Sequence, residues 1–516
     1  MDRLGGVRLR KPAAVEMVTT ETKETETAAA EEEEEEEELE EPVSPAGRLF
    51  REPQFSCHIV CAFGLAAPID MPALRAGVEA TLARHPRFCS IQVLDEDDKS
   101  ALPKWVRTKV NLDDHIIVPD LDPTATSANP EKAVEDYVSS LSTAAMAMDH
   151  SRPLWELHVL DFPTAEAAST AVLRMHHSLG DGVSLLSLLI ACSRRADDPD
   201  ALPALPAAGR RAGPLYELRR PPLAAGALAL ARWVLSYLLL VWHTVVDVAS
   251  FALTASSLTG DKRTVLKGEE GAEFRPRRFV NCTLSLDDIK HVKNAMGCTV
   301  NDVLVGLCSA ALSRYYFRRT DGESEGSNIK VRTALMVNLR PTPGVHALAK
   351  MMESGKNNGV KWGNRFGYMI LPFHLAKHDD PLEYVRKANK VARRKKNSME
   401  SIFTYWSAEM VVKIFGIKAS ASLCYGMFKN TTLSFSNLAG PSEQIVFCGH
   451  PIVYIAPSTY GHPHALTLHW LSYMNIVKLS LSLDEARFPD SHELLDDFTE
   501  SLKLIREAAA RETDKS

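Results

Sequence analysis

Several short motifs that mark common enzyme classes are absent from this sequence. It has no Gly-x-Gly-x-x-Gly and no P-loop, which argues against nucleotide binding through those loops. It also has no His-Glu-x-x-His and no Cys-x-x-Cys, so the common ligand spacings of zinc sites are missing. The charge pattern shows no nucleic-acid footprint. We therefore expect no metal ion and no nucleic-acid partner.

Cysteine is present but not in a pattern typical of disulfides. The nine cysteines are odd in number and widely scattered, which favours free, buried thiols in a reducing compartment. Met1 to Thr20 contains no apolar core of the kind that a secretory signal requires, so no secretory leader is predicted. The acidic N-terminus likewise argues against an organellar transit peptide.

Negative charge is concentrated at the N-terminus. Residues 1–41 hold 15 acidic and 5 basic residues, a net charge of −10, and the whole chain has −7, so the remainder is close to +3. The run Glu31–Glu38 repels itself and buries no apolar surface, which predicts a disordered acidic tail over 1–43. A mildly basic remainder suits a polyanionic co-substrate or an anionic membrane surface without establishing either.

Length and periodicity predict two domains. A chain of 516 residues is too long for one compact core. Strand-like and helix-like segments alternate on both sides of a segment that begins rich in Pro, Ala, Gly and Arg, which predicts an α/β (α+β layered) fold. We expect an N-terminal domain over 44–200, a linker over 201–276 and a C-terminal domain over 277–516. Expected strands include 55–63, 155–161, 170–175, 331–337 and 467–473, and expected helices include 71–85, 183–192 and 299–316.

The linker contains one long apolar stretch, Leu223 to Ala255, which is the only transmembrane candidate in this reading. Polar residues interrupt it at helical spacing and fall within an arc of roughly 60° on one side of a helix. A spanning helix would bring Arg or Asp to membrane depth, at a cost of roughly 2.5–3.5 kcal/mol each. A helix in the membrane interface is favoured, and a spanning helix or one buried in the fold are the alternatives. The polar residues are Arg232, Ser236, His243, Asp247, Ser250 and Thr254.

The most informative motif is His176-His177, followed by Asp181 and Gly182. It lies between an expected buried strand and an expected apolar helix, a junction where side chains can point into a cleft. Imidazole titrates near neutrality, so His177 suits the deprotonation of an alcohol, and Gly182 permits a sharp turn and a close substrate. The alternatives are a structural pair of histidines, or a metal site that would need further well-placed ligands.

Four other motifs accompany this one. They are Pro153-Leu154-Trp155, Asn301-Asp302, Asn338-Leu339-Arg340 and Ser436-Asn437-Leu438-Ala439-Gly440-Pro441. Together they resemble the plant branch of the bifunctional wax ester synthase/diacylglycerol acyltransferase family, from about Ser44 to about Ala509. The His-His-x-x-x-Asp-Gly element is shared with a wider superfamily of coenzyme A-dependent acyltransferases, and the combination is more specific. Plant acyltransferases of phenolics and alkaloids are expected to carry Asp-Phe-Gly-Trp-Gly, which this chain lacks.

This resemblance implies two chloramphenicol acetyltransferase-like domains with a tunnel between them. It implies transfer of a fatty acyl group from acyl-CoA to a long-chain fatty alcohol, giving wax ester, and to diacylglycerol, giving triacylglycerol. Acyl-CoA would be a co-substrate, with no bound cofactor and with a membrane surface as partner. The implied location is the cytosolic face of the endoplasmic reticulum, with the plasma membrane as the alternative. A soluble transferase for a phenolic or small alcohol and a non-catalytic acyl-lipid-binding protein are the rival functions.

The resemblance also assigns roles around the histidine pair. It makes His177 the general base, which takes the proton of the acceptor hydroxyl as that oxygen attacks the thioester. His176 is expected to support the loop or to line the cleft, with a direct catalytic role as the alternative. Asp181 either polarises His177 or holds the loop, and the resemblance favours the second role, with Arg340 as the hypothetical ion-pair partner.

The remaining motif residues each have a structural and a functional interpretation. Thr299 and Asp302 could cap a helix, whereas the resemblance makes Asn301 a hydrogen-bond donor to the oxyanion. Ser436, Asn437 and Gly440 could brace the domain interface or border the acyl tunnel. Pro153 and Trp155 could line an alkyl channel or simply pack. The basic cluster Arg393–Lys396 could hold phosphates or lipid head groups, and a solvated face is favoured; His462, His464 and His469 are interpreted as structural.

Overall fold

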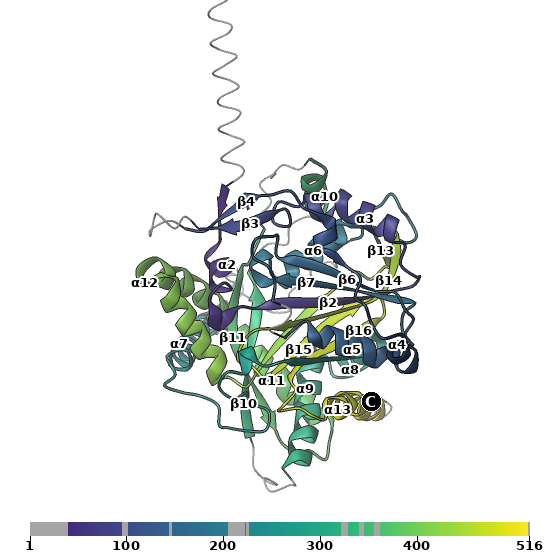
Figure 1. The fold of residues 1–516 in the computed structure, drawn as a ribbon. Coiled ribbons are helices and arrows are strands. Elements are labelled where there is room, and N and C mark those ends of the chain that lie inside the picture. The colour runs from purple at the N-terminus through teal and green to yellow at the C-terminus, as the bar shows by residue number, and fades with distance from the viewer. Residues whose placement is uncertain are drawn as a thin grey trace, which may run out of the picture.

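Two large sheets organise the chain in the computed structural model, which describes residues 40–94, 102–143, 147–204, 222, 226–320, 329–339, 345–354 and 362–513 (Figure 1). The first sheet has seven strands and the second has six. In sheet order the first contains β5 (Ile116–Ile117), β6 (Trp155–Leu160), β7 (Ser169–His176), β2 (His58–Leu65), β14 (His450–Tyr460), β13 (Ile445–Phe447) and β8 (Ser193–Arg195). The second contains β11 (Phe366–Leu375), β10 (Ile329–Asn338), β12 (Leu433–Ala439), β15 (Leu466–Tyr473), β16 (Ile476–Asp484) and β9 (Arg277–Ser285).

Helices cover these sheets, as expected for a layered α/β fold. The larger apolar core lies between the second sheet and the helices that pack on it, notably α9, α11 and α13. The helices are α2 (Pro45–Leu49), α3 (Met71–Ala80), α4 (Pro123–Ala128), α5 (Pro130–Ser140), α6 (Gly182–Ala191), α7 (Gly226–Ala255), α8 (Leu286–Ala295), α9 (Val300–Arg319), α10 (Val345–Ser354), α11 (Leu382–Lys396), α12 (Glu400–Asn430) and α13 (Ser491–Thr513). The predicted helices over 183–192 and 299–316 are confirmed as α6 and α9.

Local sequence explains the elements that carry the site. β7 is buried along almost its whole length, as its nearly continuous apolar run predicts for a strand covered on both faces. Asp181 caps the N-terminus of α6 by accepting a hydrogen bond from the Ser184 N–H. Thr299 and Asp302 form a complete capping box at the start of α9. Both helices therefore begin where the sequence places a cap.

The predicted boundary between the domains does not separate the two sheets. β13 and β14 belong to the C-terminal half of the chain, yet they join the N-terminal sheet, where β14 pairs antiparallel with β2 from Ile452–Leu65 to Tyr460–His58. The C-terminal half thereby supplies strands on both sides of the space between the sheets. This exchange ties the two domains into one body.

Two other predictions are corrected by the structure. The predicted tail ends earlier than residue 43, because β1 (Glu40–Pro42) pairs with β4 (Lys104–Arg107) in a small sheet completed by β3 (Ser90–Val93), and Glu41 forms an ion pair with Arg87. The remainder of the tail, 1–39, lies outside the described residues. The stretch around α7 is also not the only transmembrane candidate, because α12 is long and apolar enough as well, and the bent pair of α8 and α9 would make a third if counted as one span.

Candidate active site

The histidine pair lies where β7 ends and the 3-10 turn His177–Leu179 begins. Successive side chains of a strand point to opposite faces, so His176 and His177 are directed apart. The backbone of His177 is fixed on both sides: its N–H donates to the Cys57 carbonyl (2.9 Å), and its carbonyl accepts from Asn364 Nδ2 (2.9 Å). The turn therefore holds His177 in one place relative to β2 and β11.

His177 lines a cavity of about 140 Å³ between the two sheets. The walls come from β2, α6, β10, β11, β12, β14 and β15, so both halves of the chain contribute to them. Six of the sequence-predicted residues meet here: His177, Asp181, Gly182, Asn338, Ser436 and Asn437. The cavity gives His177 the open space that a catalytic base requires.

Aromatic rings hold the His177 imidazole in position. The Phe50 ring stacks on it with centroids 4.2 Å apart, and the Phe366 ring meets it edge-on at 6.3 Å. The Nδ1 atom is fully buried, and no group among the described residues meets it at hydrogen-bonding geometry. The ring nitrogen available to a substrate is therefore Nε2.

Burial lowers the pKa of His177 below its ordinary value. Its own backbone carbonyl, the charge of Asp181 and the side chain of Asn364 oppose this shift in part. A lowered pKa keeps the imidazole neutral at cytosolic pH, which is the form that accepts a proton.

A pH profile of the transfer reaction should reflect this lowered pKa. If neutral His177 is the base, kcat/KM, which reports pKa values of the free enzyme, should be lost as the pH falls through the pKa of His177, and that acidic limb should lie below 6.5, the ordinary value for histidine. The measurement is kcat/KM between about pH 5 and 8. An acidic limb that lies above 6.5 would contradict the assignment, because it would require a histidine with a raised pKa.

Asp181 is buried and joins two parts of the fold. Its Oδ1 accepts from Ser184 N–H (2.9 Å) at the start of α6, and its Oδ2 accepts from Arg365 N–H (3.0 Å) just before β11. Its charge also raises the pKa of His177. The hypothetical partner Arg340 lies outside the described residues, so that ion pair stays a prediction. The observed bonds make Asp181 a brace between α6 and the C-terminal sheet.

Substitutions of Asp181 should separate bracing from charge. Asp181→Asn retains one acceptor oxygen and Asp181→Ala retains none, and each buried N–H left without a partner costs about 1–3 kcal/mol. We expect Asp181→Ala to lower the free energy of unfolding by at least about 2 kcal/mol and Asp181→Asn to lower it by less. Chemical denaturation measures this order. Equal loss of kcat in both variants with unchanged stability would instead show that Asp181 acts through the effect of its negative charge on His177.

His176 is buried away from this cavity. Its Nδ1 pairs with Ser178 Oγ at 2.7 Å, and Ser178 Oγ also accepts from Gln92 Nε2. Burial, with the nearby His58 and His150, lowers its pKa well below the ordinary value. This environment favours the loop-supporting role over a direct catalytic one.

The other predicted residues do not line the cavity: one bonds to a residue that does, and the others are closely packed in the fold. Asn301 is exposed and does not line the cavity, but its Oδ1 accepts from Asn437 Nδ2 (2.5 Å), and Asn437 does line it. Gly440 is packed so closely that a Cβ there would lie 2.7 Å from the Ser472 carbonyl oxygen, which gives it a scaffold role. Trp155 is completely buried and donates from Nε1 to the Phe88 carbonyl, so it packs in the core beside Pro153 rather than lining the cavity.

Two side chains near His177 were missed by the sequence analysis. His469, interpreted as structural, reaches the cavity from β15, where it pairs in register with Ser436 of β12. Burial and the neighbouring His177 lower its pKa to about 3, so it is a neutral imidazole at any physiological pH. Phe50, which stacks on His177, follows α2 and carried no motif. The only signal in the sequence for His469 was the alternation of side chains in β15. Alternation does not show whether a given side of a strand faces a cavity or the packed core.

A second cavity of about 70 Å³ adjoins the first. The two share Ile59, Gly182, Leu438 and Pro457, so they meet at the start of α6. Every other side chain that lines the second cavity is apolar or a cysteine, and Leu185 and Leu189 reach it from α6. Its surface suits an alkyl chain. Within the described residues, no group of three or more His, Cys, Asp or Glu could hold a metal ion.

Comparisons with known proteins agree with this geometry. A family model described as the wax ester synthase/diacylglycerol acyltransferase catalytic domain matches residues 53–304, and the WS/DGAT C-terminal domain matches residues 362–506. Two relatives come from Arabidopsis thaliana. Wax ester synthase/diacylglycerol acyltransferase 11 is 46% identical over 91% of this chain and 95% of its own length. Wax ester synthase/diacylglycerol acyltransferase 4 is 43% identical over 92% of this chain and 91% of its own length.

Solved structures show the same architecture. A wax ester synthase/diacylglycerol acyltransferase from Marinobacter aquaeolei VT8 has a TM-score of 0.54 at 19% identity, covering 91% of this chain and 100% of that one. The first condensation domain of the calcium-dependent antibiotic synthetase has a TM-score of 0.54 at 11% identity, covering 92% and 96%. At such low identity these likenesses concern the fold, and they confirm the predicted layered α/β architecture.

Proposed function

Since the chain belongs to the wax ester synthase/diacylglycerol acyltransferase family and is an acyl-CoA-dependent O-acyltransferase, we propose that its main acceptor is a long-chain fatty alcohol and its second acceptor is diacylglycerol. The products are a wax ester and triacylglycerol. We place the reaction at the cytosolic face of the endoplasmic reticulum, because both acceptors dissolve in membranes rather than in water.

One observation carries this proposal: the cavity at His177 continues into a second cavity with apolar walls. Burying each methylene group of a chain contributes about 0.8 kcal/mol, so such a cavity favours a long alkyl chain strongly over a short or polar group. For the acceptor, the cavity at His177 offers apolar walls at Met336, Phe366 and Leu438, which suit an alkyl chain better than a polar phenolic group. We assign the second cavity to the chain of the acyl donor.

The reaction follows from the position of His177. Nε2 takes the proton of the acceptor hydroxyl while the hydroxyl oxygen attacks the thioester carbonyl. The tetrahedral intermediate then collapses with loss of the coenzyme A thiolate, which recovers the proton from the imidazolium. No acyl-enzyme forms. Holding both substrates beside His177 lowers the barrier further, because their encounter has already occurred on binding.

The negative oxygen of the intermediate needs hydrogen-bond donors. Asn301 was predicted for this role, but Asn437 and His469 line the cavity and it does not. We assign the donors to the Asn437 amide and the His469 imidazole, which its lowered pKa keeps uncharged. Asn301 then acts as a positioning residue, because it accepts a hydrogen bond from Asn437.

The test of the function is transfer from palmitoyl-CoA by the purified full-length protein to hexadecanol, diacylglycerol or a phenolic alcohol. We expect the fastest turnover with hexadecanol, slower turnover with diacylglycerol, and the slowest with the phenolic alcohol. Faster turnover of the phenolic alcohol would overturn the assignment of acceptor. Binding of acyl-CoA with no transfer to any acceptor would identify an acyl-lipid-binding protein instead.

A further inference from the structure

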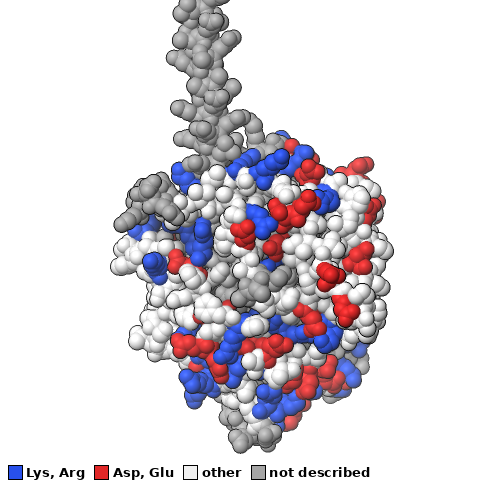
Figure 2. Space-filling view, in the orientation of Figure 1, with Lys and Arg blue, Asp and Glu red and all other residues white. Residues whose placement is uncertain are grey.

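Helices α7 and α12 expose large apolar side chains on their outer sides, whereas on their inner sides α7 buries Asp247 and Thr254, and α12 buries small, polar and apolar residues together. They pack against each other on one flank of the molecule, which is largely white in the charge-coloured view (Figures 1 and 2). Trp242 of α7 is 64% exposed and Phe415 of α12 is 70% exposed. Exposed apolar residues continue along both helices, among them Leu235, Leu238, Val241, Val245, Trp406 and Ile414. A soluble surface rarely exposes so large a continuous apolar patch.

The polar side of α7 is fastened to the protein at its middle. Asp247 is buried and forms ion pairs with Arg394 and Lys395 at the end of α11, and Lys395 also pairs with Glu400 at the start of α12. Thr244 accepts a hydrogen bond from the Met399 backbone N–H (3.0 Å). Arg394 and Lys395 of the predicted basic cluster therefore form ion pairs with α7 and do not belong to a solvated face.

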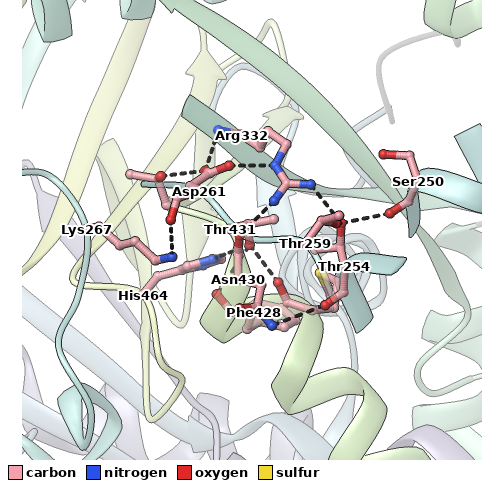
Figure 3. Close-up of polar contacts among 12 residues, drawn as sticks. Ser250, Thr254, Thr259, Asp261, Lys267, Arg332, Phe428, Asn430, Thr431 and His464 are labelled. Carbon is pink, nitrogen blue, oxygen red and sulfur yellow. Dashed lines mark hydrogen bonds and ion pairs between the residues drawn. The ribbon is translucent and has the colours of Figure 1, made fainter. Parts of the chain in front are cut away.

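The C-terminal end of α7 is fastened separately (Figure 3). Arg332 of β10 donates to Thr254 Oγ1 (2.7 Å), to the Asn430 carbonyl at the end of α12, and to the carboxylate of Asp261. Asn430 in turn donates to the Thr254 carbonyl. These contacts fix the ends of α7 and α12 to the second sheet.

These anchors determine how the helices can meet a membrane. Crossing a bilayer would expose Asp247 and Thr254 to hydrocarbon and separate them from their partners. With the anchors intact, both helices lie along the protein surface and present only their apolar sides outward. This geometry suits a helix that lies in the plane of the membrane interface.

The charged residues left exposed on these helices favour an anionic lipid surface as the partner. Arg232 on α7 and Lys413 and Lys418 on α12 are exposed and positive. Of the acidic residues on the two helices, Asp247 and Glu400 are buried and only Glu409 is partly exposed, so positive charge is in excess on their outer sides. An apolar face bordered by Lys and Arg is typical of helices that bind membranes containing anionic lipid.

An apolar cluster connects α12 to the catalytic cavity. It contains Cys424 and Phe428 of α12, Tyr368 of β11, and Phe50, which stacks on His177. Met336 and Phe366, which line the catalytic cavity, and Ile417 of α12 pack against the same cluster. Apolar side chains therefore fill the space between α12 and His177.

We propose that the outward faces of α7 and α12 form a single membrane-docking surface, and that the acceptor alcohol passes from the bilayer through the cluster at Phe50, Tyr368 and Ile417 to His177. The second half of this inference rests on the proposed function. The partner that covers the apolar face is a lipid bilayer. The two helices hold the catalytic cavity against the membrane without crossing it.

The first test compares two valines of equal exposure. Val245 on α7 is 58% exposed and Val118 in the N-terminal domain is 61% exposed. In flotation with vesicles of phosphatidylcholine and phosphatidylserine, the wild type and Val118→Glu should bind alike. Val245→Glu should bind at least about tenfold less, because it places a carboxylate in the interface. Equal binding by Val245→Glu and the wild type, or equal loss in both variants, would overturn the docking surface.

Activity measurements separate this inference from the proposed function. With hexadecanol in detergent micelles, Val245→Glu should keep the wild-type kcat, and with hexadecanol in vesicles it should lose activity about as much as it loses binding. Absence of transfer by the wild type in both assays would overturn the proposed function while leaving the flotation result intact. Loss of the Val245→Glu activity in micelles as well would contradict a role limited to docking.

A second variant tests the route of the acceptor. Ile417 is partly buried on α12 beside the apolar cluster. Ile417→Trp should raise KM for hexadecanol at least about fivefold while KM for palmitoyl-CoA and vesicle flotation stay at the wild-type values. A rise in KM for palmitoyl-CoA alone would show that the donor, rather than the acceptor, passes α12, and unchanged values of both would place the route elsewhere.

Discussion

His177→Ala is expected to lower kcat by about 10²–10⁴-fold, the usual contribution of a positioned general base. The variant keeps the cavity and the oxyanion donors but loses the nitrogen that accepts the hydroxyl proton. Acyl-CoA binding should change little, because the cavity assigned to its alkyl chain does not include His177. The measurement is kcat with saturating palmitoyl-CoA and hexadecanol, together with the lipids formed in cells that make no neutral lipid of their own.

His176→Ala is the matched control. It removes the same side chain one residue earlier, from a site that faces away from the cavity and bonds to Ser178. Its effect should appear in the free energy of unfolding rather than in kcat of the folded protein. His177→Asn keeps more of the side chain beside Phe50 than alanine does and so reduces the loss of packing in the alanine variant. A His177→Asn enzyme within tenfold of the wild-type kcat would show that His177 is not the base.

The junction that carries His177 could be predicted because its signals are local. An apolar strand, a glycine turn and a capped apolar helix follow one another within about 25 residues, and the structure has β7, the turn and α6 in those places. Asn338, Ser436 and Asn437, which belong to the motifs named from the sequence, line the same cavity as His177. These residues meet because of the order of the strands in the second sheet. The individual strands could be predicted from the sequence, but their order could not.

Features that depend on distant contacts escaped the sequence analysis. Asp181 bonds to the backbone N–H of Arg365, and no side-chain pattern indicates a backbone partner 184 residues away. β14 crosses to the N-terminal sheet, although its apolar run would equally suit the C-terminal one. His469 reaches the cavity only because β15 is the neighbour of β12.

α12 was missed for a different physical reason. Periodicity is normally interpreted with the apolar side of a helix facing the core. In α12 the small and polar residues Ser401, Thr404 and Ser420 face inward, while Trp406 and Phe415 face outward. Gly416 adds a break in the middle, with φ of 81°. The first half of α12 therefore departs from the usual pattern by exposing large apolar side chains, so these residues did not mark a core element.

Filling the apolar cavity from α6 should change the acyl chain length that the enzyme prefers. Leu185 and Leu189 line the cavity one turn apart, with Leu189 farther from the point at Gly182 where the two cavities meet. The rise of an α-helix, about 1.5 Å per residue, places them roughly 6 Å apart in depth. Leu189→Trp should exclude only the longest acyl chains, and Leu185→Trp should exclude medium chains as well.

The size of this effect follows from the burial of methylene groups. Each excluded methylene forfeits about 0.8 kcal/mol, or roughly fourfold in affinity, so loss of four should lower kcat/KM by roughly 200-fold. The measurement is kcat/KM across acyl-CoAs of increasing length with one alcohol, and then across alcohols with one acyl-CoA. The alcohol preference serves as the internal control and should not move. If it shifts while the acyl preference stays constant, the cavity holds the alcohol, and the two substrates occupy the reverse of the positions assigned here.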